Sequence, residues 1–445
     1  MGTVRAESLV SAVRAGNVTA VRNLLALGAD PNEETGADGL PVLCTAVAAY
    51  DAPVAEALVE GGADPDCVLP DGTTPLWRAV DGGSPAVFTA VLGQEPRLRL
   101  PEDARTKLLA LARSWYETGA EAELRRRTGA PGPATRLQIL DDPYTSVDQV
   151  SLGGQDVRAG HGAILTSMEW AFRILTPVEE LIRRAVLPQD EDHVDWWEAA
   201  SVLGRRGSTE TRSAVLAYRH HPDPLHRRFV VLCLWMRAIV GTGGSTAENE
   251  EADFLAAWAS EETDGETLAK VLDAFTEHEH PRMRAIVLRH IDHPDPRVRR
   301  EVPCGLPTLD EPLTPEAREA LLTLMHDRDA DVRLNACRAG IRDEVLLPQV
   351  TQALLILAVD ADTRIRGAVA ADLAACRVRT PEVSEALWGL LDEDDQLTRL
   401  EAAYGLALRD DPRTGEAADR VGPLAEDHGD DHRVSALWDW HRNPL

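Results

Sequence analysis

The sequence predicts an all-α protein made of two helical solenoids, and three observations support this fold class. Near the N-terminus, short segments recur after 33 or 34 residues. Toward the C-terminus, an Asp and an Arg four residues apart recur at a similar period. Between these markers, apolar residues follow helical spacing. A fixed period that carries a helical apolar stripe is typical of stacked helical hairpins, in which each repeat is buried by its neighbours.

The first array is marked by turns of similar sequence. Residues 24–32 recur as residues 58–66, and an Asp-Gly turn follows each copy. Glycine adopts the positive φ that ends a helix, and Asp-Gly favours a tight turn. Thr74 is placed to cap the next helix, with Pro75 in its first turn, where no backbone N–H is needed. The spacing predicts three short helical repeats in residues 6–92.

These markers resemble those of the ankyrin-repeat family. Residues 74–77 read Thr-Pro-Leu-Trp where the family has Thr-Pro-Leu-His. Residues 101–127, with leucines and a tryptophan at helical spacing, are then expected to form a C-terminal cap, so that the ankyrin-like region spans residues 6–127. In such arrays a partner contacts turn tips and inner helices. The resemblance therefore implies four candidate partner-binding residues, which are Tyr50, Asp71, Arg78 and Asp81.

Residues 128–160 differ from their surroundings, because Gly and Pro clusters bracket a polar stretch with little helical period. We expect a linker there. The predicted domains are residues 1–127, with ankyrin-like repeats and their cap, and residues 161–445, with the second array. A glycine-rich loop at 241–246 is a second, softer boundary.

The second array begins near residue 161 and is defined by pairs of Asp and Arg. The pairs are Asp223/Arg227, Asp295/Arg299, Asp329/Arg333, Asp362/Arg366 and Asp395/Arg399. The preceding helices are expected at residues 315–325, 347–358 and 381–391. Residues 161–445 resemble bacterial HEAT repeats, in which a second helix opens with Asp and a Val-Arg-like pair; here these pairs include Val298-Arg299 and Val332-Arg333.

The Asp/Arg series could be a row of partner contacts, but its regularity favours a structural role. An Asp at a helix start accepts from free backbone N–H groups and contributes about 1 kcal/mol. An Arg four residues later reaches either that Asp or the Asp of the next repeat. Such a contact would set how the repeats stack.

The net charge of −28 disfavours attraction to nucleic acid or anionic lipid, and residues 128–445 carry −22 of it. Acidic turns at repeat period should line up as a ribbon. We therefore expect Asp392, Glu393 and Asp394 to attract a partner with a basic surface. The alternative is that the ribbon only keeps a monomeric solenoid soluble.

No metal or cofactor site is expected. His278, His280, His290 and His293 lack the spacing and companion ligands of a zinc site, and we found no phosphate loop or nucleophile motif. Six scattered cysteines, none in a Cys-x-x-Cys pair, fit reduced thiols in a cytoplasmic protein. No apolar run reaches the length of a membrane span.

Trp196 and Trp197 cannot both face the same way on a helix, so one of them is a candidate contact anchor on a solenoid surface. The sequence thus favours a non-enzymatic scaffold or adaptor that binds another protein. One alternative is an alkylpurine DNA glycosylase of HEAT-like fold, which the acidity of residues 128–445 opposes. Another is a regulator or immunity-type protein that sequesters a basic partner.

Overall fold

The computed structural model describes residues 8–35, 39–240, 245–307, 312–424 and 431–442. The chain divides into two compact units, residues 1–242 and residues 243–445. Both are mostly helical, as the sequence predicts. The division coincides with the glycine-rich loop at 241–246, most of which lies outside the described residues.

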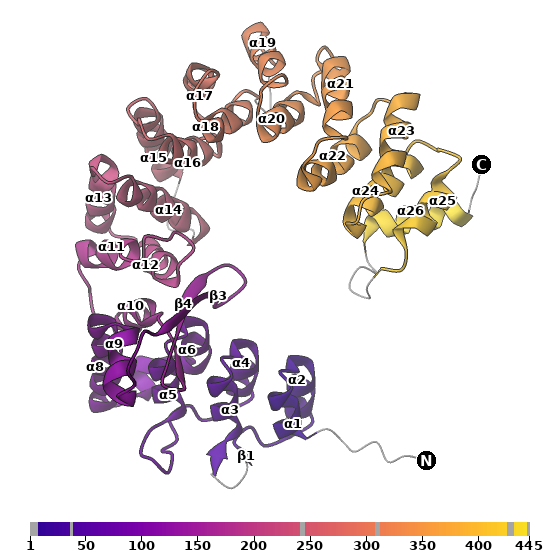
Figure 1. Cartoon of the computed structure of the whole chain (residues 1–445). Helices are drawn as coiled ribbons and strands as arrows, with labels where there is room; N and C mark the ends of the chain where they lie inside the picture. The colour runs from indigo at the N-terminus through magenta and orange to yellow at the C-terminus, as the bar shows by residue number, and fades with distance from the viewer. Residues whose placement is uncertain (1–7, 36–38, 241–244, 308–311, 425–430, 443–445) are drawn as a thin grey trace, which may run out of the picture. The chain divides into compact units, whose positions relative to one another are not determined.

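Unit 1 opens with three helical hairpins whose helices form two rows (Figure 1). One row holds α1 (Leu9–Arg14), α3 (Val42–Ala48) and α5 (Pro75–Gly82). The other holds α2 (Val18–Ala26), α4 (Ala52–Glu60) and α6 (Pro85–Leu92). Strands β1 (Glu34–Thr35) and β2 (Leu40–Pro41) form a short antiparallel pair between the first two hairpins.

The expected turn chemistry is confirmed in these hairpins. The hydroxyl of Thr74 accepts from the backbone N–H of Trp77 at 3.0 Å, and Pro75 is the first residue of α5. Gly28 and Gly62 follow α2 and α4 with φ of 92° and 97°, the left-handed region that glycine adopts without strain. Glycine therefore ends one helix of a repeat, and the Thr-Pro pair begins the first helix of the next.

The region expected to cap these repeats forms α7 (Pro96–Arg99), α8 (Glu102–Thr118) and α9 (Ala120–Thr128). Gly119, with φ of 84°, separates α8 from α9. Leu108 and Ala112 of α8 join the core of the hairpins, together with Ile164 and Met168 of α10 (His161–Ala171). The apolar core thus continues through the cap into the helix beyond it.

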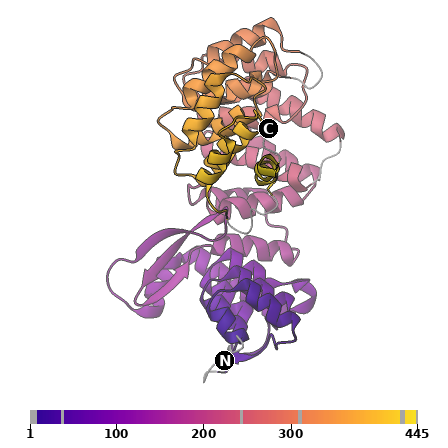
Figure 2. The ribbon, with the colours of Figure 1, turned by 90° about the vertical axis from the view of Figure 1, so that its right-hand side faces the viewer.

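Residues 128–160, where a linker was expected, contain an antiparallel sheet (Figure 2). Its strands are β3 (Thr135–Leu140), β4 (Ser146–Leu152) and β5 (Gln155–Arg158), in the order β3-β4-β5. Gly153 and Gly154, both with positive φ, make the two-residue turn between β4 and β5. Val147, Val150 and Val157 are buried, so the sheet is packed into unit 1.

The remaining helices of unit 1 are α11 (Val178–Val186), α12 (Val194–Arg205), α13 (Thr209–Ala217) and α14 (Pro224–Val240). A 3-10 turn, η2 (Tyr218–His220), joins the last two. Helix α12 packs against α10, α11 and α14 and is therefore central to this part of the unit.

Unit 2 is a succession of helical hairpins, again in two rows (Figure 1). The first helices of the hairpins are α15 (Ser245–Ala259), α17 (Met283–Val287), α19 (Pro315–Leu324), α21 (Leu347–Leu357), α23 (Pro381–Leu390) and α25 (Thr414–Val421). The second helices are α16 (Gly265–Thr276), α18 (Pro296–Glu301), α20 (Ala330–Gly340), α22 (Thr363–Ala375), α24 (Gln396–Ala407) and α26 (His432–Arg442). Two 3-10 turns, η3 (Leu288–His290) and η4 (Val302–Gly305), extend α17 and α18.

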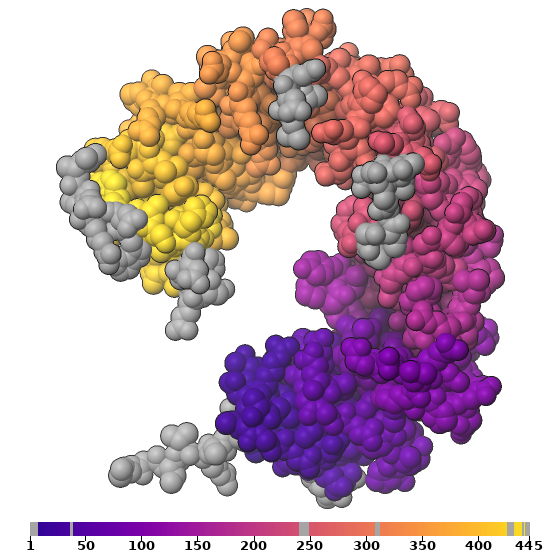
Figure 3. Space-filling model, turned by 180° about the vertical axis from the view of Figure 1, so that it is seen from behind, coloured from indigo at the N-terminus to yellow at the C-terminus, as the bar shows by residue number. Residues whose placement is uncertain are grey.

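Helices α19, α21 and α23 confirm the three helices predicted in this region to within one residue at each end. In the space-filling view, successive repeats of unit 2 lie in contact in chain order, from red through orange into yellow (Figure 3). The second helices make most of these contacts, because each packs against the second helix of the next repeat.

Candidate functional site

The four candidate residues in the ankyrin-like region are occupied by contacts within unit 1. The Tyr50 hydroxyl donates to the backbone oxygen of Gly82 at 3.1 Å, and the Arg158 guanidinium lies 4.3 Å from the centre of its ring. Asp71 pairs with Arg78 at 2.9 Å and accepts from Thr73. These hydrogen bonds lower the pKa of Asp71 to about 2.

Asp81 holds the cap helices on the third hairpin. Its carboxylate accepts from the indole N–H of Trp115 on α8 at 2.8 Å and from two nitrogens of Arg127 on α9 at 2.8 Å each. The ring of His161 stacks on Trp115 with centroids 4.8 Å apart. Burial lowers the pKa of His161 to about 4, so this ring is neutral near pH 7. Asp81 is thus a structural link.

A second link, which the sequence did not indicate, is centred on Asp141 in the loop between β3 and β4. Its side chain is 1% exposed. It accepts from the Ser84 hydroxyl at 2.6 Å, from the backbone N–H of Ala86 at 2.7 Å and from Arg158 at 2.8 Å. The contact to Ala86 satisfies a free N–H in the first turn of α6, so the carboxylate caps that helix from a distant segment. Asp141 therefore fastens the sheet to the third hairpin.

In unit 2 the Asp/Arg series is a stacking device, as its regularity predicted. Asp329, Asp362 and Asp395 cap their own helices. Each Arg four residues after the cap donates to two backbone oxygens of its own turn, as Arg299 does to His293 and Pro294 at 2.7 and 3.2 Å.

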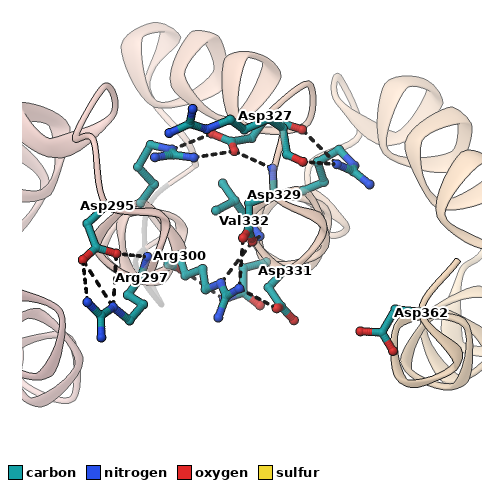
Figure 4. Close-up of polar contacts among 12 residues, drawn as sticks. Asp295, Arg297, Arg300, Asp327, Asp329, Asp331, Val332 and Asp362 are labelled. Atoms are coloured by element: carbon teal, nitrogen blue, oxygen red, sulfur yellow. Dashed lines mark hydrogen bonds and ion pairs between the residues drawn. The ribbon is translucent and has the colours of Figure 1, made fainter. Parts of the chain in front are cut away.

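In three of these repeats a second contact of the Arg reaches the turn of the next repeat. Figure 4 shows this region around Asp327 and Asp329. The inter-repeat pairs are Arg299 with Asp327, Arg333 with Asp360 and Arg366 with Glu393, at 2.7 to 2.9 Å. The acceptor is the acid two residues before the next cap, and not the capping Asp itself. We call this series the arginine ladder.

The ladder changes the interpretation of the acidic turn at 392–394. Glu393 accepts two hydrogen bonds of 2.7 Å from Arg366, so it is part of the stacking contact. Asp392 pairs with Arg420 at 3.2 Å. The backbone oxygen of Asp394 accepts from Arg399 at 2.8 Å, and its carboxylate has no ion pair within the described part of unit 2. Of the three acids, Glu393 is therefore the least available to a partner.

The tryptophan pair on α12 separates as helix geometry requires. Trp196 is 2% exposed and packs edge-on against Phe229, with ring centroids 4.9 Å apart, so it belongs to the core. Trp197 is half-buried and meets the exposed Trp235 of α14 edge-on at 6.0 Å. Trp197 lines a groove, whereas Trp196 points away from it into the core.

This groove, which we call the Trp197 groove, has a volume of about 1050 Å³ and lies within unit 1. One side is formed by α4 and α6, the other by α12 and Met236 of α14, and the β3–β4 loop closes part of it. On α12 it is lined by Val194, Trp197, Glu198 and Ser201. Trp197 and Glu198 lie three and four residues after Val194 and four and three residues before Ser201, so the four share one broad helix face. The facing residues of α4 and α6 include Ala52, Ala86, Thr89 and Ala90.

The groove lining carries five carboxylates and one guanidinium. The guanidinium, Arg99, pairs with Asp66 at 2.9 Å, and the Asp141 carboxylate is matched by Arg158. Burial raises the pKa of Glu198 to about 7, against the opposing effects of Arg205 and Ser167. Arg205 lies 3.6 Å from Glu198 Oε1, beyond hydrogen-bonding distance. The remaining charge of the groove is negative.

Within the described residues, no group of three or more His, Cys, Asp or Glu side chains is arranged to hold a metal ion. His280 instead lies 3.1 Å from Asp253. All six cysteines are free thiols. No helix in the described ranges combines the length and the apolar character needed to cross a bilayer.

Comparisons with known proteins identify the first part of the chain. Residues 9–99 match the family model for ankyrin repeats, in three copies. No curated protein matches the chain. Among solved structures, the chain is similar to the karyopherin Kap121p bound to the extreme C-terminus of the protein phosphatase Cdc14p, with 11% identity and a TM-score of 0.35. That similarity covers 98% of this chain and 52% of the karyopherin, so the chain spans about half its length.

Proposed function

We propose that this protein is a non-enzymatic scaffold or adaptor that binds another protein through unit 1. The observation that carries the proposal is the Trp197 groove, which sets a half-buried aromatic side chain between helices of an ankyrin-repeat array and the helices that follow it. Half-buried aromatic residues in concave sites are the usual anchors of protein interfaces. The ankyrin fold is itself typically used for interaction and not for catalysis.

In this proposal unit 2 is a HEAT-like array that extends the scaffold. The support is the arginine ladder, which fixes how each hairpin stacks on the next without using a catalytic group. The chain would act as a monomer in the cytoplasm, where its six free thiols remain reduced. A regulator that sequesters a basic partner is one form of the same function, favoured by the negative charge of the groove.

Site-specific crosslinking in the native host tests the proposal. The photoreactive residue p-benzoylphenylalanine is placed at Thr89, an exposed groove position on α6, in the full chain. A matched chain carries it at Lys107, an exposed position on α8 outside the groove. We expect a protein adduct that depends on light and on position 89. Equal adducts at both positions, or no protein adduct at position 89, would contradict the proposal.

A further inference from the structure

The proposed function leaves the chemistry of the partner open, and the Trp197 groove itself constrains it. Four of its carboxylates belong to Glu56, Glu60, Asp142 and Glu198. Among the described residues, Glu56 and Glu60 have neither an ion pair nor a hydrogen bond to another side chain, and Asp142 accepts only from backbone N–H groups of its own loop. An occupant that brings positive charge would therefore meet no competing cation on α4.

The negative charge of the groove and the proposed function together indicate the occupant. A protein partner that brings positive charge does so through arginine or lysine side chains. The lining residues of α4 and α6 include three small ones, Ala52, Ala86 and Ala90, which leave room for a polypeptide backbone beside them.

Resting on the function proposed above, we propose that the Trp197 groove binds an extended basic segment of the partner protein, with an arginine side chain against the Trp197 ring and the Glu198 carboxylate. A guanidinium stacks on an aromatic face and pairs with a carboxylate at the same time. Trp197 and Glu198 both line the groove, four and three residues before Ser201, so an arginine side chain that lies along this face of α12 can contact both. The carboxylates of Glu56 and Glu60 on α4 then face the neighbouring basic residues of the segment.

Fluorescence anisotropy with defined peptides tests this proposal on the full chain. The probe is a fluorescein-labelled nonapeptide with two arginines separated by two alanines. The matched peptide has citrulline, the neutral isostere, at both positions. We expect the arginine peptide to bind at least tenfold more tightly than the citrulline peptide, and the preference to shrink in high salt.

Variants locate the binding. Trp197→Ala and Glu198→Gln should each weaken binding fivefold or more, whereas Trp388→Ala, which removes a half-buried tryptophan of unit 2, should leave it unchanged. If Trp197→Ala does not fold, Thr89→Arg replaces it: this exposed change puts a cation and bulk into the groove and should abolish binding.

The outcomes separate the two proposals. Equal affinity for the arginine and citrulline peptides would overturn the basic-segment proposal, and so would spermine binding as tightly as the peptide at the same site. A protein adduct at position 89 would still support the scaffold function in either case. Binding that Thr89→Arg leaves intact would place the basic segment elsewhere and also overturn the proposal.

Discussion

The two units hold neighbouring helices together in different ways. In unit 1 the ankyrin repeats are joined to the sheet and to the later helices by contacts that occur once each, centred on Asp141 and on Asp81. In unit 2 the same Arg-to-carboxylate contact recurs from one repeat to the next. A contact that occurs once joins unlike surfaces, whereas a recurring contact joins like surfaces. Removing one of these contacts should therefore lower the unfolding free energy more in unit 1 than in unit 2.

The largest expected effect is that of Asp141→Ala. The change leaves the mostly buried Arg158 without its carboxylate and removes the acceptors of Ser84 and of the Ala86 N–H. Breaking a buried ion pair from one side costs about 3–5 kcal/mol. We expect the unfolding free energy of unit 1, measured by urea denaturation, to fall by this amount.

The neighbouring loop residue Asp142 is the matched control. Its carboxylate accepts only from the backbone N–H groups of Tyr144 and Thr145, both at 2.7 Å. Asp142→Ala should therefore cost about 1 kcal/mol, as other local side-chain caps do. Equal losses for the two variants would show that the sheet is not fastened through Asp141.

Gly83 gives the next largest effect at the same junction. It ends α5 with φ of 74°, and a Cβ there would lie 1.8 Å from the backbone oxygen of Arg158. Gly83→Ala combines backbone strain with a clash against backbone and should cost about 3 kcal/mol. Gly72, with φ of 81° and open space around it, is the control, and Gly72→Ala should cost about 1 kcal/mol. Thermal unfolding of the two variants measures the difference.

One step of the ladder in unit 2 should matter less. Arg299 is 5% exposed and holds both Asp327 and two backbone oxygens of its own turn. We expect Arg299→Ala to lower the unfolding free energy of unit 2 by about 2 kcal/mol, because several acceptors lose their donor. Arg364 pairs with Asp331 at 2.7 Å but is 62% exposed, so Arg364→Ala should have little effect. A larger loss for Arg364 than for Arg299 would contradict the stabilising role of the buried contact.

The smallest effect concerns the pH dependence of Glu198. Its pKa is raised to about 7 in the folded chain, with Arg205 the nearest cation and the groove carboxylates Glu56, Glu60 and Asp142 across from it. The folded state therefore binds this proton more tightly than the unfolded state. The protonation of Glu198 therefore stabilises the folded state below pH 4.5, and this stabilisation is lost as the pH rises through 7.

Glu198→Gln removes this dependence. With a side chain 24% exposed, the difference is about 1 kcal/mol after allowing for solvent screening. We expect the unfolding free energy of the variant, minus that of the wild-type chain, to be larger at pH 8 than at pH 5. Denaturation of both chains at the two pH values measures this difference. A difference that does not change with pH would exclude the raised pKa.

The sequence predicted the periodic parts of the molecule because each carries its own marker. Thr74 caps α5, and Asp329 caps α20, where the patterns placed them. The sequence predicted the positions of the ladder arginines but not their carboxylate partners. Four-residue spacing does not tell whether Arg299 binds its own Asp or the acid in the next turn. The contact to Asp327, 28 residues on, needs the stacked structure.

The non-periodic parts were missed for a physical reason. Asp141 lies 57 residues from Ser84, and no local pattern joins them. The sheet did have one signal, the pair Gly153-Gly154, which is typical of a two-residue hairpin turn. For Trp196 and Trp197, helix geometry predicted that they would separate, but not which of them would face a groove. That choice depends on the packing of Phe229 against α12.

The arginine ladder has a consequence for how the length of this chain can change. Because Arg299, Arg333 and Arg366 each bind an acid 27 or 28 residues ahead, the contact is the same at these three steps. Removing one 33-residue repeat, for instance the one that ends at Asp360, would leave Arg299 bound to an acid and Arg366 bound to the next turn. Gene duplication or deletion can therefore lengthen or shorten unit 2 without leaving a buried charge unmatched. The same change is not open to unit 1. If its third hairpin were duplicated, only one of the two copies could bind the Asp141 carboxylate.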